Sequence, residues 1–178
     1  MASSGPHLKD TSPRREAILI RRFAPGDERA VKALISQIMN EEFHEARTAY
    51  PTDDIENILT SYGGLGEAFF VAVCGDHVVG TVAVKKEDDR VALLRRLFVS
   101  GAFRKQQIGL KLIDRILQFC QEVGYEEIIF KTTSAMQAAV KTCQKRGFVP
   151  RAKIDLGGTE LLKFSLSLRD GHKGTKSK

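Results

Sequence analysis

Apolar and polar residues follow two different periods along this chain, the period of two that is typical of β-strands and the longer period of an amphipathic helix. Strand-like alternation, rich in β-branched and aromatic residues, is found at residues 17–23, 68–74, 77–85, 91–99, 127–132, 149–153 and 160–168. Helical spacing begins after Asp27 and after Thr52, and it returns at residues 109–122 and 135–146. The predicted order of elements is therefore β-α-α-β-β-β-α-β-α-β-β.

Glycine, proline and aspartate mark the boundaries between these elements. Pro25-Gly26 ends the first strand, and Asp27 then stands where a helix N-cap is expected. Gly75-Asp76 joins two strand-like runs with the two-residue connection of a hairpin. Gly124 follows a helix at the point where a left-handed residue is common. The pattern predicts one α/β (α+β) domain over residues 16–168.

Composition places the chain among ordinary folded proteins. Its 178 residues, of which 42% are hydrophobic and 28% charged, are enough for one domain with a sizeable core. No apolar run is long enough to span a bilayer, and residues 1–15 lack the apolar segment of a signal peptide, so we expect a cytoplasmic protein without a membrane partner. Residues 1–15 and 169–178 are expected to be flexible tails, the second of them basic.

Charge and cysteine content narrow the range of partners. Much of the formal net charge of +6 lies in the two tails, and the body shows no basic stripe with interleaved aromatic residues, so no nucleic-acid partner is expected. Cys74, Cys120 and Cys143 are odd in number and widely spaced, and none belongs to a CxxC motif. They are expected to be reduced thiols rather than disulfides or metal ligands.

The segment from Leu97 to Leu110 has the sequence of an anion-binding loop. A strand-like run leads into a short polar loop that carries Arg104 and Lys105, and an amphipathic helix begins near Gly109. The first N–H groups of a helix lack partners, and the helix dipole favours negative charge beside them. A pyrophosphate group suits this arrangement.

These residues resemble the GCN5-related N-acetyltransferase (GNAT) superfamily. Its pyrophosphate loop reads Arg or Gln, two residues, Gly, one residue, then Gly or Ala, and residues 104–109 here read RKQQIG. Gln107 replaces the first glycine, and we expect its backbone to donate its N–H with a negative φ. The resemblance extends over residues 17–168, because the following strand, helix and Gly147-Phe148 come in the family's order.

The resemblance implies a single-domain GNAT fold and acetyl-CoA as co-substrate, with no metal. The fold would be a mixed, mostly antiparallel sheet of about seven strands, splayed between the fourth and fifth strands and flanked by about four helices. The pantetheine arm would pair with strand backbone as an extra strand does. The residues implied to bind acetyl-CoA are Leu97, Phe98, Val99, Arg104, Lys105, Gln106, Gln107, Ile108, Gly109, Leu110, Thr132 and Thr133.

The side chains that transfer protons in many relatives are replaced in this chain. Leu93 stands where a carboxylate often lies on the fourth strand, and Met136 and Cys143 stand where the last helix often carries Asn and Tyr. A thiol has a pKa comparable to that of CoA, so Cys143 is one candidate for the acid that protonates the departing thiolate. The other interpretation of Cys143 is a small buried residue of the core.

Acceptor-pocket candidates lie in the polar segment 40–51 and on the fourth strand. Glu42, His44 and Tyr50 belong to the segment that borders this pocket in relatives. Strict alternation would place Arg95 and Arg96 on opposite faces, with Arg95 on the face of Leu97. Arg95 then either points into the acceptor cleft and selects an acidic substrate or pairs with a neighbour on the sheet.

The sequence therefore favours an N-acetyltransferase that moves the acetyl group of acetyl-CoA to a primary amine by direct attack in a ternary complex. The alternative is a non-catalytic acetyl-CoA-binding regulatory module, which the missing proton-transfer residues favour. Acceptor loops differ among such enzymes, so both a small-molecule and a peptide amine remain open as acceptor, as does a homodimer.

Overall fold

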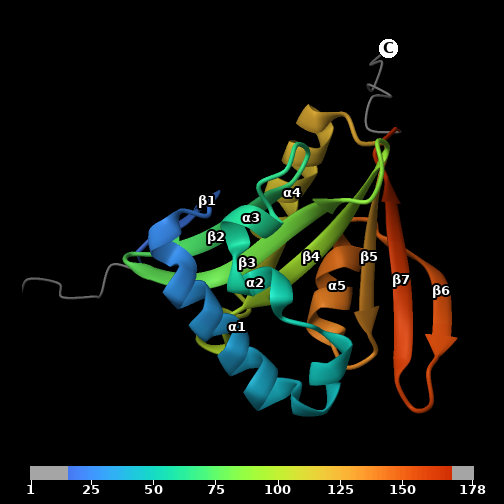
Figure 1. The fold of residues 1–178 in the computed structure, drawn as a ribbon, viewed down its shortest axis with the longest axis horizontal. Helices are drawn as coiled ribbons and strands as arrows, with labels where there is room; N and C mark the ends of the chain where they lie inside the picture. The colour runs from blue at the N-terminus through green and yellow to red at the C-terminus, as the bar shows by residue number, and fades with distance from the viewer. Residues whose placement is uncertain (1–15, 170–178) are drawn as a thin grey trace, which may run out of the picture.

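The computed structural model describes residues 16–169, and the expected flexible tails lie outside this range apart from Arg169. Seven strands are present (Figure 1). Their bounds are β1 Ile18–Arg22, β2 Ala68–Cys74, β3 His77–Lys86, β4 Val91–Val99, β5 Glu127–Thr133, β6 Val149–Asp155 and β7 Glu160–Ser167. Each lies where the alternation of the sequence predicts a strand.

The four predicted helical regions are also present, although the second is divided into two short helices. The helices are α1 Glu28–Glu42, α2 Asp53–Glu56, α3 Ile58–Ser61, α4 Ile108–Val123 and α5 Gln137–Lys145. The division falls at Asn57, whose side chain accepts a hydrogen bond from the N–H of Thr60 (3.2 Å) and so begins α3 afresh. Within residues 16–169 no helix is long and apolar enough to cross a membrane.

Asp27 occupies the N-cap position of α1, as expected, but its side chain does not cap the helix. Its carboxylate makes no hydrogen bond to the first turn of α1 and instead binds Arg21 through two hydrogen bonds of 2.6 and 2.8 Å. It also accepts the N–H of Ala24 at 2.8 Å. The buried carboxylate therefore ties the end of β1 to the start of α1.

The strands form one sheet in the order β1-β2-β3-β4-β5-β7-β6. Every neighbouring pair is antiparallel except β4 and β5, which are parallel. The mixed, mostly antiparallel sheet expected from the sequence is confirmed.

Two apolar cores lie on opposite faces of this sheet. Alternate residues of β2 separate cleanly: Phe70 packs in the core with α4 and α5, and Val71 packs in the core with α1, α2 and α3. We call these the α4 core and the α1 core, and the two faces of the sheet the α4 side and the α1 side. On β3, Val82 and Ala83 divide in the same way. Because both faces are covered by helices in this half of the molecule, β2 is an almost continuous apolar run.

A β-bulge interrupts the alternation of β4. Thr81 pairs with Phe98, whereas Ala83 pairs with Arg95, so β4 carries one extra residue between these pairs. Arg96 has a φ of +55° there, and its carbonyl accepts the hydroxyl of Thr81 at 2.7 Å. A bulge bends its strand and increases the local twist.

Beyond the same region β4 and β5 part from each other. Their parallel pairing starts at Val91 with Glu127 and ends at Leu94 with Phe130. The last residues of both strands are therefore not bonded to each other, and the splay expected between the fourth and fifth strands is present. This opening positions the candidate site.

Candidate functional site

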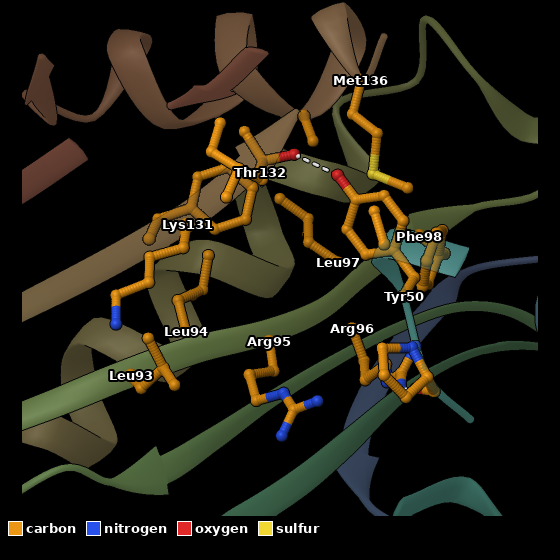
Figure 2. Close-up of a pocket in the computed structure, with 15 residues that line it drawn as sticks. Tyr50, Leu93, Leu94, Arg95, Arg96, Leu97, Phe98, Lys131, Thr132 and Met136 are labelled. Carbon is orange, nitrogen blue, oxygen red and sulfur yellow. Dashed lines mark hydrogen bonds between the residues drawn. The ribbon is translucent and has the colours of Figure 1, made fainter. Parts of the chain in front are cut away.

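A cavity of about 240 Å³ occupies the opening between β4 and β5 (Figure 2). Residues of β4 and β5, of the start of α5, of the segment just before α2 and of the start of β7 line it. They are Ala49, Tyr50, Pro51, Leu93, Leu94, Arg95, Arg96, Leu97, Phe98, Phe130, Lys131, Thr132, Met136, Ala139 and Leu161. The cavity is mainly apolar, with a few polar groups at defined places, as small-molecule sites commonly are.

Tyr50 crosses this opening and binds the end of β5. Its hydroxyl donates to Thr133 Oγ1 (3.0 Å), accepts the N–H of Thr133 (2.7 Å), and lies 3.1 Å from Thr132 Oγ1. Figure 2 shows the phenol directed toward Thr132 across the cavity. Tyr50, predicted to border the acceptor, and Thr132, predicted to bind acetyl-CoA, are thus brought together by the fold.

A buried ion pair lies beside the cavity at the β4 bulge. Arg96 holds Asp54 through both carboxylate oxygens, with Nε at 2.9 Å from Oδ2, and Nη2 also donates to the carbonyl of Pro51 at 2.5 Å. Tyr62 donates its hydroxyl to the same carboxylate. Burial raises the pKa of Asp54, but the hydrogen bonds from Arg96 and Tyr62 outweigh it and hold the pKa below its usual range.

Arg95 and Arg96 lie on the same side of the sheet, contrary to the expectation from strict alternation. The extra residue of the bulge turns Arg96 toward Asp54 as well, and Nη2 of Arg95 lies 3.8 Å from Asp54 Oδ1. Leu97 consequently packs in the α4 core, on the face opposite to Arg95. Arg95 keeps a partly exposed guanidinium at the wall of the cavity.

The loop before α4 presents a group of free backbone donors. Among the described residues, no acceptor is found for the N–H groups of residues 105–110, and the first helical bond runs from Lys111 N–H to the carbonyl of Gln107 (3.1 Å). Lys105 and Gln107 both have left-handed backbones, with φ of +62° and +63°. Where right-handed and left-handed residues alternate along a loop, their successive N–H groups point toward one place and can bind a single anion.

The negative φ expected for Gln107 is therefore wrong. Glycine occupies this position of the family motif without strain, whereas glutamine must adopt the left-handed conformation that disfavours a side chain. The loop therefore presents its free N–H groups at the cost of a strained backbone at Gln107.

Arg104 is engaged by protein groups. Its Nη2 lies 2.5 Å from Glu42 Oε1 at the end of α1, and its Nε donates to the carbonyl of Val99 (3.2 Å). Glu42 is thereby a partner of the loop, and neither Glu42 nor His44 lines the cavity. Of the four acceptor candidates, the structure brings Tyr50 and Arg95 to the cavity wall.

Cys143 lies in the α4 core with no exposed surface, and burial raises the pKa of its thiol to about 12. It does not line the cavity, whereas Leu93 and Met136 do. The candidate thiol acid is thus separated from the cavity.

Sequence reasoning did not single out Asp54 or Lys131, because each has the appearance of a solvated charge. Asp54 stands in the first turn of a short helix, where acids are common, and Lys131 stands at an exposed strand position. No group of three or more His, Cys, Asp or Glu side chains within residues 16–169 is arranged to hold a metal ion.

Residues 33–148 match the family described as the Acetyltransferase (GNAT) family. This match spans more than half of the chain, and with the fold and the loop geometry described above it shows that the chain belongs to this family.

The chain is similar to N-acetylaspartate synthetase of Danio rerio, with 37% identity over 47% of this chain and 30% of that protein. It is 36% identical to N-acetyltransferase 8 of Mus musculus over 53% of this chain and 44% of that protein. It therefore spans less than half the length of these curated relatives. The fold matches yncA of Salmonella typhimurium, solved with its cofactor acetyl-CoA, with a TM-score of 0.72, 19% identity, and coverage of 91% of this chain and 99% of that one.

We predict that Gln107→Gly stabilises the protein. Removing a side chain from a left-handed residue relieves about 1–2 kcal/mol, and the larger entropy of unfolded glycine offsets about half of it. The expected net gain in the free energy of unfolding is about 0.5–1 kcal/mol, measured by urea denaturation. Gln106→Gly is the matched control, since Gln106 has no positive φ, and it should destabilise the protein slightly. Equal effects of the two changes would contradict the argument.

We also predict that Asp54→Asn lowers the free energy of unfolding by about 3 kcal/mol at pH 7, because it leaves the Arg96 guanidinium buried without a counter-charge. Asp53→Asn removes a neighbouring exposed carboxylate and should change stability by less than about 0.5 kcal/mol.

The difference between wild type and Asp54→Asn should depend on pH. The folded-state pKa of Asp54 is lowered, so its stabilising effect is complete above the unfolded pKa of about 4 and is lost as the pH falls through the folded pKa. Chemical denaturation between pH 7 and pH 3 measures this; a difference that stays constant over the range would exclude the ion pair as its source.

Proposed function

We propose that this chain binds acetyl-CoA and transfers its acetyl group to the primary amine of an acceptor in a ternary complex. The observation that carries the proposal is the set of free N–H groups at residues 105–110, which lies at the start of α4. These donors and the helix dipole suit the pyrophosphate. Beyond Leu94 and Phe130 the facing edges of β4 and β5 no longer bond to each other, and they offer backbone groups to the pantetheine arm.

The two sides of the cavity suit two different substrates. On the α4 side, the loop donors and the backbone of Leu97 to Val99 would hold the co-substrate. On the α1 side, Tyr50 and Arg95 border an opening through which an amine could reach the thioester. Holding both reactants in one cavity provides much of the rate of such a transfer, because the reaction between them becomes effectively unimolecular.

Tyr50 is the residue we propose as proton donor to the departing thiolate. The transfer forms an amide C–N bond and breaks the thioester C–S bond, so the sulfur must gain a proton and the amine must lose one to solvent. The N–H of Thr133 donates to the phenol oxygen at 2.7 Å and fixes its position. The buried thiol of Cys143 is left with a packing role.

A non-catalytic acetyl-CoA-binding module is the second candidate. Leu93 cannot act as a base, and the burial of Cys143 removes one acid. Such a module would bind acetyl-CoA through the same loop but would not acetylate any amine. Measuring the release of CoA thiol in the presence of a panel of amines therefore distinguishes it from an enzyme.

Gly109→Asp is predicted to lower acetyl-CoA affinity at least about a hundredfold, because a carboxylate beside the free N–H groups repels the pyrophosphate and competes for its donors. Gly109→Ala is the matched control. Its Cβ would meet Thr142 Cγ2 at the same 3.2 Å but adds no charge, so affinity should stay within about tenfold. Isothermal titration measures both; equal affinities of the aspartate variant and wild type would refute the site.

Tyr50→Phe is predicted to lower kcat by about a hundredfold with acetyl-CoA affinity within a few-fold, which is the size of effect expected for one general acid. Cys143→Ala should keep kcat within a few-fold and lose about 1 kcal/mol of stability. An unchanged kcat for Tyr50→Phe would point to solvent as the proton source.

A further inference from the structure

The apolar core on the α1 side of the sheet contains no residue of β5, β6 or β7. Ile129 of β5 pairs with Leu93 of β4, and both lie on the α1 side outside the two core clusters, although Ile129 itself is buried. Leu161 of β7 lies on the same side and is also outside both cores. Figure 1 shows β7 and β6 at the edge away from α1, α2 and α3. We call the α1-side surface of β5, β7 and β6 the open face.

Four cationic side chains form a row that begins at the cavity and continues over this face, one each from β4, β5, β7 and β6. Arg95 belongs to β4 and Lys131 to β5, and Figure 2 shows both side chains leaving their strands toward the same side. Lys163 of β7 is the direct register partner of Lys131. Arg151 of β6 donates from Nε to Ser165 Oγ (2.8 Å), on the open face beside Lys163. We call Arg95, Lys131, Lys163 and Arg151 the basic row.

The charges of the basic row lack counter-ions within the described residues. No carboxylate there lies within 4.0 Å of the last three members, and the acid near Arg95, Asp54, is already held by Arg96. Lys153, on the opposite face of β6, is by contrast paired with Glu160 at 2.9 Å. Like charges directly opposite each other on neighbouring strands destabilise a sheet. An anionic partner would relieve this repulsion.

The length and position of the basic row indicate the shape of that partner. Arg95 and Lys131 line the cavity, whereas Lys163 and Arg151 lie outside it. Neighbouring strands are about 4.8 Å apart, so four strands extend over about 14 Å, the length of about four extended residues. A small acid would contact the first two cations and leave the others free, while an extended chain can contact all four.

We propose, building on the acetyl transfer proposed above, that the acceptor is an acidic polypeptide. Its amine enters the cavity from the α1 side, and the carboxylates that follow lie along the basic row. A second copy of this chain is disfavoured as occupant, because a symmetric contact would bring one basic row against another. A nucleic acid offers the charge but lacks an alkyl amine for the cavity.

Two peptides with a free N-terminus test the proposal, alanine followed by three glutamates and alanine followed by three glutamines. The full-length protein should acetylate the glutamate peptide with a kcat/KM at least about tenfold higher, and this preference should fall as salt rises. In the double variant Lys163→Gln, Arg151→Gln the preference should drop about tenfold, as expected for two partly exposed ion pairs. Lys153→Gln makes a matched change of charge on the opposite face and should keep the preference.

Binding of the same peptides, labelled at the C-terminus and followed by fluorescence anisotropy, separates the two proposals. Binding of the glutamate peptide that depends on Lys163 and Arg151, without acetylation of any amine, would refute the transfer and leave the surface standing. Equal acetylation of both peptides, insensitive to the double variant, would refute the acidic acceptor alone. Displacement of the glutamate peptide by a tenfold lower concentration of single-stranded oligothymidine, or a dimer in sedimentation that Lys163→Gln abolishes, would also overturn it.

Discussion

The ion pair between Arg96 and Asp54 is the interaction on which the site depends. Arg96 is the residue of β4 with a left-handed backbone, and a non-glycine residue holds that conformation only when its surroundings require it. Here the guanidinium binds the Asp54 carboxylate and the Pro51 carbonyl, so the β4 bulge is tied to the start of α2. The same contact fixes the segment that carries Tyr50. The bulge, the opening beside it and one wall of the cavity are therefore one cooperative unit.

The bulge also determines which side chains of β4 lie on each face of the sheet. Beyond the bulge, Leu97 packs in the α4 core and Phe98 in the α1 core. The alternation of faces is therefore shifted by one residue relative to the start of the strand. Since the pairing of β4 with β5 ends before the bulge, the two strand ends no longer bond to each other at the cavity, although β4 still pairs with β3 and β5 with β7. The α4 side then presents N–H donors and the α1 side presents cations. An acetyl donor and an acidic amine acceptor could approach from different directions without competing for the same groups.

The residues that replace the proton-transfer side chains of many relatives are apolar or buried in this chain. Leu93 and Met136 give the cavity apolar surface and Cys143 is buried away from it, which leaves the Tyr50 phenol as the hydroxyl that crosses the cavity to β5. Burial that raises the pKa of Cys143 to about 12 makes it a poor partner for proton exchange with a thiolate at neutral pH. The proposed chemistry therefore rests on a loop positioned by tertiary contacts rather than on a helix.

The sequence alone determined the order of the elements, because this follows from local periodicity, and the mixed sheet followed from the resemblance of residues 104–109 and their surroundings to the GNAT family. The polar loop before a helix start also predicted free backbone donors, which the structure contains. Of the four acceptor candidates that the sequence offered, Glu42, His44, Tyr50 and Arg95, only Tyr50 and Arg95 line the cavity. The sequence could not determine the φ of Gln107, the common side of Arg95 and Arg96, or the pairing of Asp54, which lies 42 positions before Arg96. The reason is that alternation assumes an uninterrupted strand. An extra residue is tolerated where a distant carboxylate and a neighbouring strand stabilise it, and only the tertiary structure brings those groups together.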